Sequence, residues 1–454
     1  MTKNFEQLGV SAFFTKRLED RNIRDATDIQ RKIIPHLAEG KSIFFASATG
    51  TGKTFAYLLP ILGKIKETLH SDTEPSTLRN DTETEKACIN SGMQKPHKKQ
   101  ETKNTRRDSG RISPCFLIIA PTLELCSQIF SELEFLLEGS VIRSSLAIGS
   151  INLERQIEKI KKTKPDIIVG NPGRLLVLTE KRIIKLNNLR FLVLDEADRL
   201  VSDEMSDETN RLCKLIMQSN SKPGKSLTIA ACSATMNKKN REKLLNACGI
   251  KDIQFIESSD NEILRDRIEH WAIFSEKRRK DQTLRSLLSA LKVKGSAKRQ
   301  PSKKGKSRIK ALVFTSRGDE AGFVLSHLQH HQVSAAGLFG KINKKPLSGQ
   351  ERMSALEKFR QGDVEVLVST DLAARGLDIP GITHVIALDV PSDSEIYIHR
   401  CGRTARAGKR GTMVTIGDET QMHLLAAMEK KLKIRILPKE LHYGQVTVPA
   451  PIED

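Results

Sequence analysis

Short runs of apolar residues recur along the chain, separated by longer stretches in which apolar residues have a helical spacing. Short continuous apolar runs are typical of strands buried on both faces of a parallel sheet, and the amphipathic stretches between them predict crossover helices. After the first run, Phe55, Leu58, Leu59 and Leu62 fall on one helical face. The pattern therefore predicts an α/β fold with mostly parallel sheets. The runs are 42–46, 116–120, 167–169, 191–194, 228–232, 311–314, 364–368, 385–388 and 413–416.

These runs form two sets that are joined near 258–282, so we expect two α/β domains. A chain of 454 residues is long enough for two or three domains with separate cores. The predicted boundaries are 1–258 for the first domain, 259–281 for a linker, 282–442 for the second domain and 443–454 for a short tail.

Two polar stretches interrupt the pattern. Residues 70–111 show no apolar period and predict a disordered insertion on the first domain. Residues 294–310 carry eight Lys or Arg and no acidic residue, which predicts a flexible basic loop. This loop either contacts the phosphates of a nucleic acid or is simply solvated.

The charge balance indicates a polyanionic partner. The formal net charge is +20, and nucleic acid is the commonest polyanion that so basic a protein meets. A solubilising charged surface is the alternative. Aromatic residues make up only 4%, which favours recognition of backbone phosphates over stacking of bases on aromatic rings.

The remaining composition narrows the class of protein. No run approaches ~18 apolar residues, so we expect no membrane segment. The first nine residues lack the basic and apolar regions of a secretory signal, which predicts a cytoplasmic protein, or a nuclear or nucleolar one in a eukaryotic host. The seven cysteines are scattered without a C-x-x-C pair, which argues against a zinc site and for reduced thiols.

A phosphate-binding loop follows the first predicted strand and opens the first long helix. Its residues are Ser47, Ala48, Thr49, Gly50, Thr51, Gly52, Lys53 and Thr54. The glycines let backbone N–H groups approach phosphate oxygens, and the helix N-terminus adds partial positive charge. We expect Lys53 to reach the β- and γ-phosphates of ATP and Thr54 to hold Mg²⁺.

Three carboxylates follow the predicted strand at 191–194. They are costly at a strand end unless a cation lies nearby, and nucleotide-bound Mg²⁺ meets this need. Asp195 is best placed for the metal, directly or through water. Glu196 then lies beside the attacking water as a general base. Asp198 completes the group.

The sequence Asp-Glu-Ala-Asp at 195–198 resembles the motif of the DEAD-box family of superfamily 2 helicases. The resemblance covers essentially the whole chain outside the two polar stretches. It implies two tandem RecA-like domains, each a mostly parallel sheet with helices on both faces, and an RNA-stimulated ATPase. It also implies an adenine motif at 5–30, in which Gln30 pairs with adenine and Phe5 stacks on it.

Further segments resemble the RNA-facing motifs of the first domain. The implied RNA contacts are Pro121, Thr122, Gly149 and Arg174, through backbone amides, hydroxyls and one guanidinium group, which read no base sequence. Three positions depart from the family pattern: Leu123 replaces an Arg, Ser150 replaces the second Gly of a pair, and Asn171 replaces a Thr. Without the resemblance these segments would be ordinary turns at strand ends.

The second domain supplies a second group of implied site residues. Arg403 and Arg406 are the implied arginine fingers, whose planar groups match the charge that develops on a transferring phosphoryl group. The resemblance places Asp378 near the ribose. Arg317 stands where a phosphate-contacting Thr or Ser is usual, and Gly349 where a Gln is usual. Other implied roles are RNA contacts for Arg317, Thr370 and Gly376 and coupling between the two sites for Asp198, Ser233, Thr235 and His399.

The resemblance therefore predicts a monomeric ATP-dependent RNA helicase that uses ATP and Mg²⁺ and closes its two domains on RNA. Two alternatives stay open, a DNA-directed helicase and an ATP-gated RNA clamp or scaffold with slow turnover. Ribonucleoprotein or pre-ribosomal partners, with a role in ribosome assembly, are one interpretation of its pathway.

Overall fold

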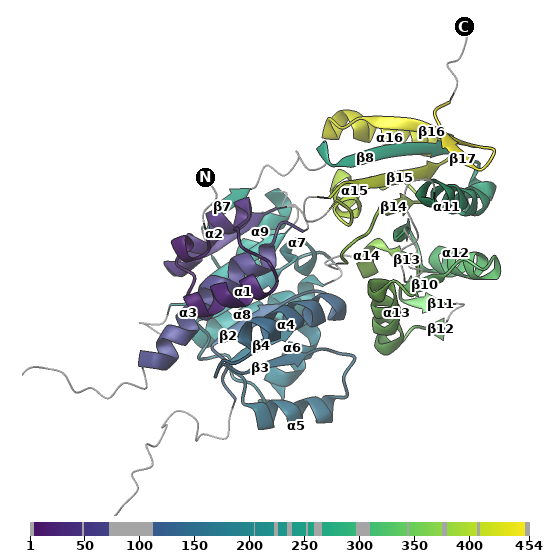
Figure 1. The fold of residues 1–454 in the computed structure, drawn as a ribbon. Helices are drawn as coiled ribbons and strands as arrows, with labels where there is room; N and C mark the ends of the chain where they lie inside the picture. The colour runs from purple at the N-terminus through teal and green to yellow at the C-terminus, as the bar shows by residue number, and fades with distance from the viewer. Residues whose placement is uncertain are drawn as a thin grey trace, which may run out of the picture.

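The computed structural model describes residues 4–47, 50–71, 112–203, 205–221, 226–233, 238–250, 253–257, 266–296, 309–342, 345–374, 379–405 and 409–449. These residues form two lobes, each built around one main sheet (Figure 1). Most of the predicted insertion at 70–111 and of the predicted basic loop at 294–310 lies outside the described residues.

The first sheet has seven parallel strands in the order β3-β4-β2-β5-β6-β1-β7. All five apolar runs predicted in this domain are strands. The bounds are β1 (Ile43–Ala46), β2 (Phe116–Ile119), β3 (Ser144–Ala147), β4 (Ile167–Gly170), β5 (Phe191–Asp195), β6 (Thr228–Ser233) and β7 (Gln254–Glu257).

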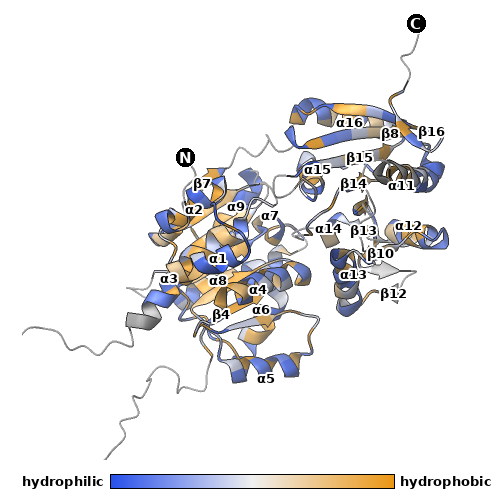
Figure 2. Ribbon diagram, in the orientation of Figure 1, coloured by the Kyte–Doolittle hydropathy of each residue, from blue (hydrophilic) through white to orange (hydrophobic). Residues whose placement is uncertain are grey.

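Successive strand side chains point to opposite faces of this sheet, so each face has its own core. Phe45 packs with α1 to α4, while its neighbour Phe44 packs with α5, α6, α8 and α9. Figure 2 shows hydrophobic colouring concentrated on the strands of this sheet, while the helices around it carry both hydrophobic and hydrophilic residues. The helices are α1 (Ala12–Asp20), α2 (Asp28–Ala38), α3 (Lys53–Ser71), α4 (Leu123–Leu137), α5 (Leu153–Thr163), α6 (Pro172–Glu180), α7 (Ala197–Leu200), α8 (Ser206–Asn220) and α9 (Lys238–Cys248), with a 3-10 turn at Glu6–Leu8.

The second sheet has eight strands in the order β10-β13-β9-β14-β15-β8-β16-β17, parallel except for the last pair. Two of its strands differ from the expected boundaries. β8 lies inside the predicted linker, between β15 and β16, and β17 lies in the predicted tail. The bounds are β8 (Ile268–Phe274), β9 (Ala311–Thr315), β10 (Ala335–Leu338), β13 (Val366–Thr370), β14 (His384–Ala387), β15 (Gly411–Gly417), β16 (Ile436–His442) and β17 (Gln445–Thr447), with a separate ribbon of β11 (Lys341–Ile342) and β12 (Lys345–Pro346).

Helices cover both faces of the second sheet as well. Val313 packs with α11 and α12, while Leu312 packs with α13 to α16. The predicted fold class, two tandem α/β domains with helices on both faces, is therefore confirmed. No helix within the described ranges is long and apolar enough to cross a bilayer. The helices are α11 (Lys280–Ser296), α12 (Gly318–His330), α13 (Gly349–Gln361), α14 (Asp371–Ala374), α15 (Ser394–Cys401) and α16 (Glu419–Leu432), with a 3-10 turn at Lys277–Arg279.

Candidate nucleotide site and nucleic-acid face

The phosphate-binding loop connects β1 to α3, as the sequence predicts. Gly50 and Gly52 have φ angles of 83° and 90°, a region in which side chains other than glycine are strained. The Lys53 ammonium donates to the Ser47 carbonyl oxygen at 2.6 Å, and the Ser47 and Thr51 hydroxyls lie 2.7 Å apart. Ala48 and Thr49 lie outside the described residues. Hydrogen bonds within the described part of the loop therefore hold its shape, and the loop leads directly into the N-terminus of α3.

Asp195 is held by three donors. It ends β5, and its side chain is 4% exposed. The Tyr57 hydroxyl donates to its Oδ2 at 2.9 Å, the Glu196 amide donates to Oδ1 at 2.9 Å, and the Cys232 thiol donates to Oδ1 at 3.1 Å. No sequence motif singles out Tyr57 or Cys232, yet both fix the orientation of this carboxylate.

Glu196 lies next to Asp195 in a backbone conformation that is unusual for its type. Its φ of 49° turns the chain sharply from β5 into α7. Burial raises the pKa of the Glu196 carboxyl to about 7, with Asp198 raising it further and Arg403 opposing the rise. A carboxyl that titrates near neutral pH is suited to accept a proton from water.

Arg403 brings the second domain to this group. Its side chain is 2% exposed, and its Nε donates to the His399 carbonyl oxygen at 3.2 Å. Burial lowers the pKa of the Lys53 ammonium. The carboxylates of Asp195 and Glu196 oppose this fall, whereas the positive charge of Arg403 adds to it. Arg403 therefore lies within electrostatic reach of Lys53 and Glu196, although they belong to the other domain. Arg406 lies outside the described residues.

Asp195 and Thr54 offer oxygen ligands on one side of the site, because both interact with the Tyr57 hydroxyl. Mg²⁺ usually binds through one or two carboxylates, substrate phosphates and several waters. Within the described ranges, no group of three or more His, Cys, Asp or Glu side chains could hold a metal. The Asp195 carboxylate and the Thr54 hydroxyl are oxygen donors of the kind that Mg²⁺ prefers, so these residues fit a magnesium ion bound together with a nucleotide.

Gln30 connects the predicted adenine motif to the phosphate-binding loop. Its side-chain oxygen accepts from the Thr27 amide at 2.9 Å, and its side-chain nitrogen donates to the Gly52 carbonyl oxygen at 3.0 Å. Phe5 is 0% exposed and packs in the core of the first domain. In this structure its ring has no open face, so stacking on adenine stays a prediction that requires the ring to become accessible.

The predicted RNA contacts of the first domain lie at strand ends and helix starts. The Thr122 hydroxyl accepts from the Leu125 amide at 3.2 Å and so caps α4, directly after the buried Pro121. Arg174 donates to the carbonyl oxygens of Gly149 at 2.9 Å and Ile151 at 3.0 Å. Arg174 therefore fixes the turn that carries Gly149, a role the sequence analysis missed.

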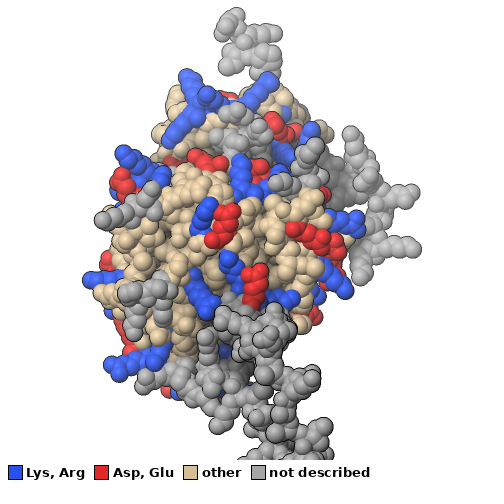
Figure 3. Space-filling view, turned by 90° about the vertical axis from the view of Figure 1, so that its left-hand side faces the viewer, with Lys and Arg blue, Asp and Glu red and all other residues tan. Residues whose placement is uncertain are grey.

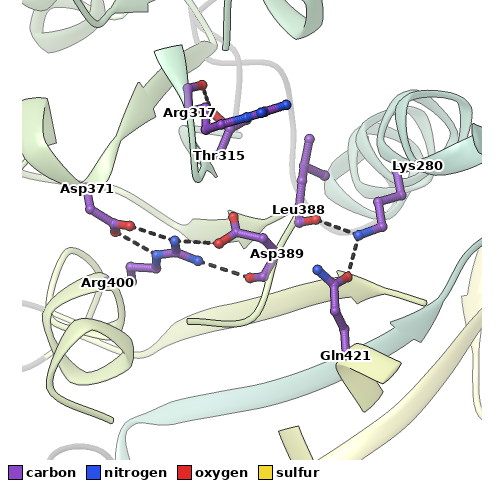
Figure 4. Close-up of polar contacts among 8 residues, drawn as sticks. All are labelled: Lys280, Thr315, Arg317, Asp371, Leu388, Asp389, Arg400 and Gln421. Carbon is purple, nitrogen blue, oxygen red and sulfur yellow. Dashed lines mark hydrogen bonds and ion pairs between the residues drawn. The ribbon is translucent and has the colours of Figure 1, made fainter. Parts of the chain in front are cut away.

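In the second domain, Thr370 ends β13 and the exposed Arg317 follows β9, so both lie at the same edge of two adjacent strands. Figure 4 shows Arg400 between two carboxylates: Asp371, at two distances of 2.7 Å, and Asp389, at 2.9 Å. This buried ion pair ties the segment after Thr370 to the helix that precedes Arg403. Gly376 and Asp378 lie outside the described residues.

The predicted coupling residues are only partly described. Ser233 is fully buried at the end of β6, and its carbonyl oxygen accepts from the Ser47 amide at 3.1 Å. Asp198 lies in the first turn of α7, two residues after Glu196, and the carbonyl oxygen of the buried His399 accepts a hydrogen bond from Arg403 Nε. Thr235 lies outside the described residues. Ser233 thus connects the strand nearest the acidic group to the phosphate-binding loop.

Charges on the face of the first lobe shown in Figure 3 are mixed. Lys and Arg side chains lie interspersed with Asp and Glu on this face. The net positive charge of the chain is therefore not gathered into one basic patch on this part of the surface.

Comparisons with known proteins agree with this architecture. A model of the DEAD/DEAH box helicase family matches residues 27–244, and a model of the helicase conserved C-terminal domain matches residues 280–408. A DEAD-box ATP-dependent RNA helicase CshC of Bacillus cereus is 29% identical, over 97% of this chain and 94% of the relative. An ATP-dependent RNA helicase CshA of Listeria monocytogenes is 31% identical, over 96% of this chain and 70% of the relative.

Solved structures share the fold. Dbp5 of S. cerevisiae, bound to RNA and ADP BeF3, has a TM-score of 0.74 at 22% identity, covering 97% of this chain and 96% of that one. Mss116p, bound to ssRNA and AMP-PNP, has a TM-score of 0.77 at 24% identity, covering 97% of this chain and 80% of that one.

Proposed function

The chain belongs to the DEAD-box family of ATP-dependent RNA helicases, and we propose that it hydrolyses ATP at the seam of its two domains to remodel RNA locally. One observation supports the seam most strongly. Arg403 of the second domain is buried within electrostatic reach of Lys53 and Glu196 of the first, and Arg352 Nε lies 3.4 Å from Glu124 Oε1 across the same two domains. A site divided in this way is complete only when the domains are closed.

In the closed state Lys53 binds the terminal phosphates, and Gln30 orients the adenine edge beside the loop that it already contacts through Gly52. Glu196 accepts the proton of the attacking water. Arg403 and Arg406 stabilise the charge that develops on the transferring phosphoryl group. Thr54 and Asp195 would hold a magnesium ion together with the nucleotide, and the ion would neutralise negative charge at the phosphates.

RNA binding across both domains is the second half of the proposal. Thr122, Gly149, Arg317 and Thr370 end or follow strands in their two sheets, where hydroxyls, amides and a guanidinium group suit backbone phosphates. ATP and RNA each bridge both domains, so each favours the closed state and strengthens the binding of the other. A closed groove that bends one strand separates a short duplex without long translocation.

In the cell, the proposed role is the remodelling of RNA duplexes or RNA–protein complexes, including those formed during ribosome assembly. The bacterial origin of the two curated relatives supports a cytoplasmic location. Partners beyond RNA would come from such ribonucleoprotein particles.

The test compares ATP turnover with no nucleic acid, with single-stranded RNA and with DNA of equal length and sequence. Strong stimulation by RNA alone is expected, because the 2′-OH distinguishes the two polymers. Equal stimulation by DNA would favour a DNA-directed helicase. RNA-stimulated turnover without separation of a short RNA duplex would favour an ATP-gated clamp.

A further inference from the structure

The first turn of α13, in the second domain, lies against one corner of the first domain. A Cβ atom added to Gly349 would lie 2.8 Å from the Ser150 Cβ and 3.7 Å from Leu123 Cδ2. Carbon atoms pack best at about 3.5–4.0 Å, so the first of these contacts is a clash. Ser150 Cβ is bonded directly to the backbone and cannot rotate away. A side chain at position 349 would therefore have to displace the turn that carries Ser150 or push the two domains apart.

The same face of α13 makes a second contact across the domains. Arg352 Nε lies 3.4 Å from Glu124 Oε1, and the Glu124 side chain is only 3% exposed. Burial raises the pKa of Glu124, and Arg352 opposes the rise. Residues three apart lie on one helix face, so Gly349 and Arg352 dock together. Any displacement of the first turn would also stretch this ion pair.

Space, not backbone conformation, is what Gly349 provides. Its φ is not positive, so other residues could adopt its backbone angles. The helix start is secured separately, because Ser348 and Glu351 cap it in both directions, at 2.8 Å and 3.2 Å. A substitution at 349 would thus leave the helix intact and change only what the helix meets.

Gly349 and Ser150 are also two of the positions at which the sequence departs from the family pattern. A side chain is absent at 349, where Gln is usual, and a side chain is present at 150, where Gly is usual. Another departure, Leu123, lies at the same contact and is apolar where Arg is usual. The two opposite changes in size therefore face each other across the domain boundary.

We propose that Gly349 and Ser150 are a pair of residues matched in size, whose close contact permits the two domains to close beside the RNA face. The inference rests on the proposed function, because closure is the active state there. Both are positioning residues: they set how closely Arg403 approaches Lys53 and Glu196, and they touch neither phosphate nor water. Leu123 makes this corner an apolar contact between the two domains, whereas an Arg at this position would place a charge there.

The experiment measures closure and turnover in the full chain with three substitutions, Gly349→Ala, Gly349→Gln and Ser150→Gly, alone and combined. Fluorophores at exposed Glu158 in α5 and Lys431 in α16 report the distance between the domains by energy transfer, with RNA and a non-hydrolysable ATP analogue. ATP turnover is measured in parallel at saturating RNA. Gly318→Ala is the matched control, because Gly318 also begins a helix of the second domain but has open space around its Cβ position.

Both substitutions at Gly349 should lower the closed population and RNA-stimulated turnover about 10- to 100-fold, the range that overpacking produces. Gly349→Ala should at the same time leave the second domain folded, because position 349 has no positive φ and Ser348 and Glu351 cap the helix. Ser150→Gly should restore most of the loss in both Gly349 variants. Gly318→Ala should leave closure and turnover unchanged.

Normal closure of the Gly349→Gln variant would overturn the inference, and so would failure of Ser150→Gly to restore either variant. Both results would leave the proposed function standing, because the unsubstituted chain would still close with ATP analogue and RNA. If the unsubstituted chain did not close with both ligands, the proposed function would fail and this inference with it.

Discussion

The two domains contribute to the site in different ways. In the first domain the site side chains bind one another: Tyr57 and Cys232 hold Asp195, and Gln30 holds the phosphate-binding loop. In the second domain a buried network around Arg400, which binds Asp371 and Asp389, holds the backbone that leads to Arg403. The first domain is thus assembled to receive a nucleotide, whereas the second is built to deliver a guanidinium group to it. Binding and hydrolysis should therefore respond differently to substitutions in the two domains.

The largest effect is expected from Arg403→Ala. ATP binding should persist, because the first domain is unchanged, while hydrolysis should fall by about 10³-fold or more, since arginine fingers contribute that much. Binding of a fluorescent ATP analogue and RNA-stimulated phosphate release measure the two quantities separately. Arg410→Ala, at an exposed position of the same domain, is the control. Unchanged turnover in the Arg403 variant would reject its proposed role.

Lys53→Ala should impair both binding and hydrolysis, which distinguishes it from the Arg403 variant. Removing one preorganised donor from a charged transition state costs about 10²–10³ in rate. The same two assays apply. Lys41→Ala removes an exposed lysine that pairs with Glu39 in the same domain, and it should change neither quantity. If the Lys53→Ala variant kept its normal RNA-stimulated ATPase activity, the proposed mechanism, in which Lys53 binds the terminal phosphates, would be wrong.

Tyr57→Phe should have a smaller and more specific effect. It deletes the hydroxyl that orients Asp195, and a hydrogen bond to a charged group contributes about 1.5–3 kcal/mol. The Mg²⁺ concentration that gives half-maximal ATP turnover, and half-maximal binding of labelled ADP, should rise about tenfold. Tyr397→Phe removes another buried hydroxyl, which bonds His270 in the second domain, and should not alter the Mg²⁺ requirement. An unchanged requirement in the Tyr57 variant would show that Asp195 needs no such support.

The smallest effect concerns stability of the second domain in acid. Burial lowers the pKa of His384 to about 4. In the unfolded chain the His384 imidazole has its usual pKa of about 6.5, so it binds a proton that the folded domain excludes. The free energy of unfolding should therefore fall as pH drops from about 6.5 to 4. Thermal unfolding followed by the single tryptophan, Trp271, measures this, since its ring lies 6.5 Å from that of His384. His384→Asn should reduce the acid sensitivity; exposed His423→Asn should not, and equal sensitivity in all three chains would contradict the assignment.

The sequence predicted the buried strands well and the outer strands poorly. β1, β2, β4, β5 and β6 are continuous apolar runs because helices cover both of their faces. β7 and β16 carry polar residues in exposed positions, so they show no such run. β8 lies inside the predicted linker and shows no continuous apolar run, because Glu269 and His270 interrupt it, although His270 is buried against Tyr397.

Local motifs identified the candidate site, but its supporting contacts had no local signal. The residues of the phosphate-binding loop follow one another in the sequence, and so do the residues at 195–198. The chemistry of each motif can therefore be inferred from its spacing alone. Tyr57 lies 138 residues from Asp195, and only the fold brings them together. The contact of Arg352 with Glu124 depends on how two domains meet, which no periodicity encodes.

The central claim is that one triphosphate contacts both domains at once. The most direct measurement uses an ATP analogue with a photoreactive group on its γ-phosphate, irradiated with and without RNA and followed by mapping of the labelled peptides. With RNA, the account predicts labelling of the segment that contains Lys53 and of the segment that contains Arg403; without RNA, it predicts labelling mainly of the first. Labelling confined to the first domain in the presence of RNA would contradict it.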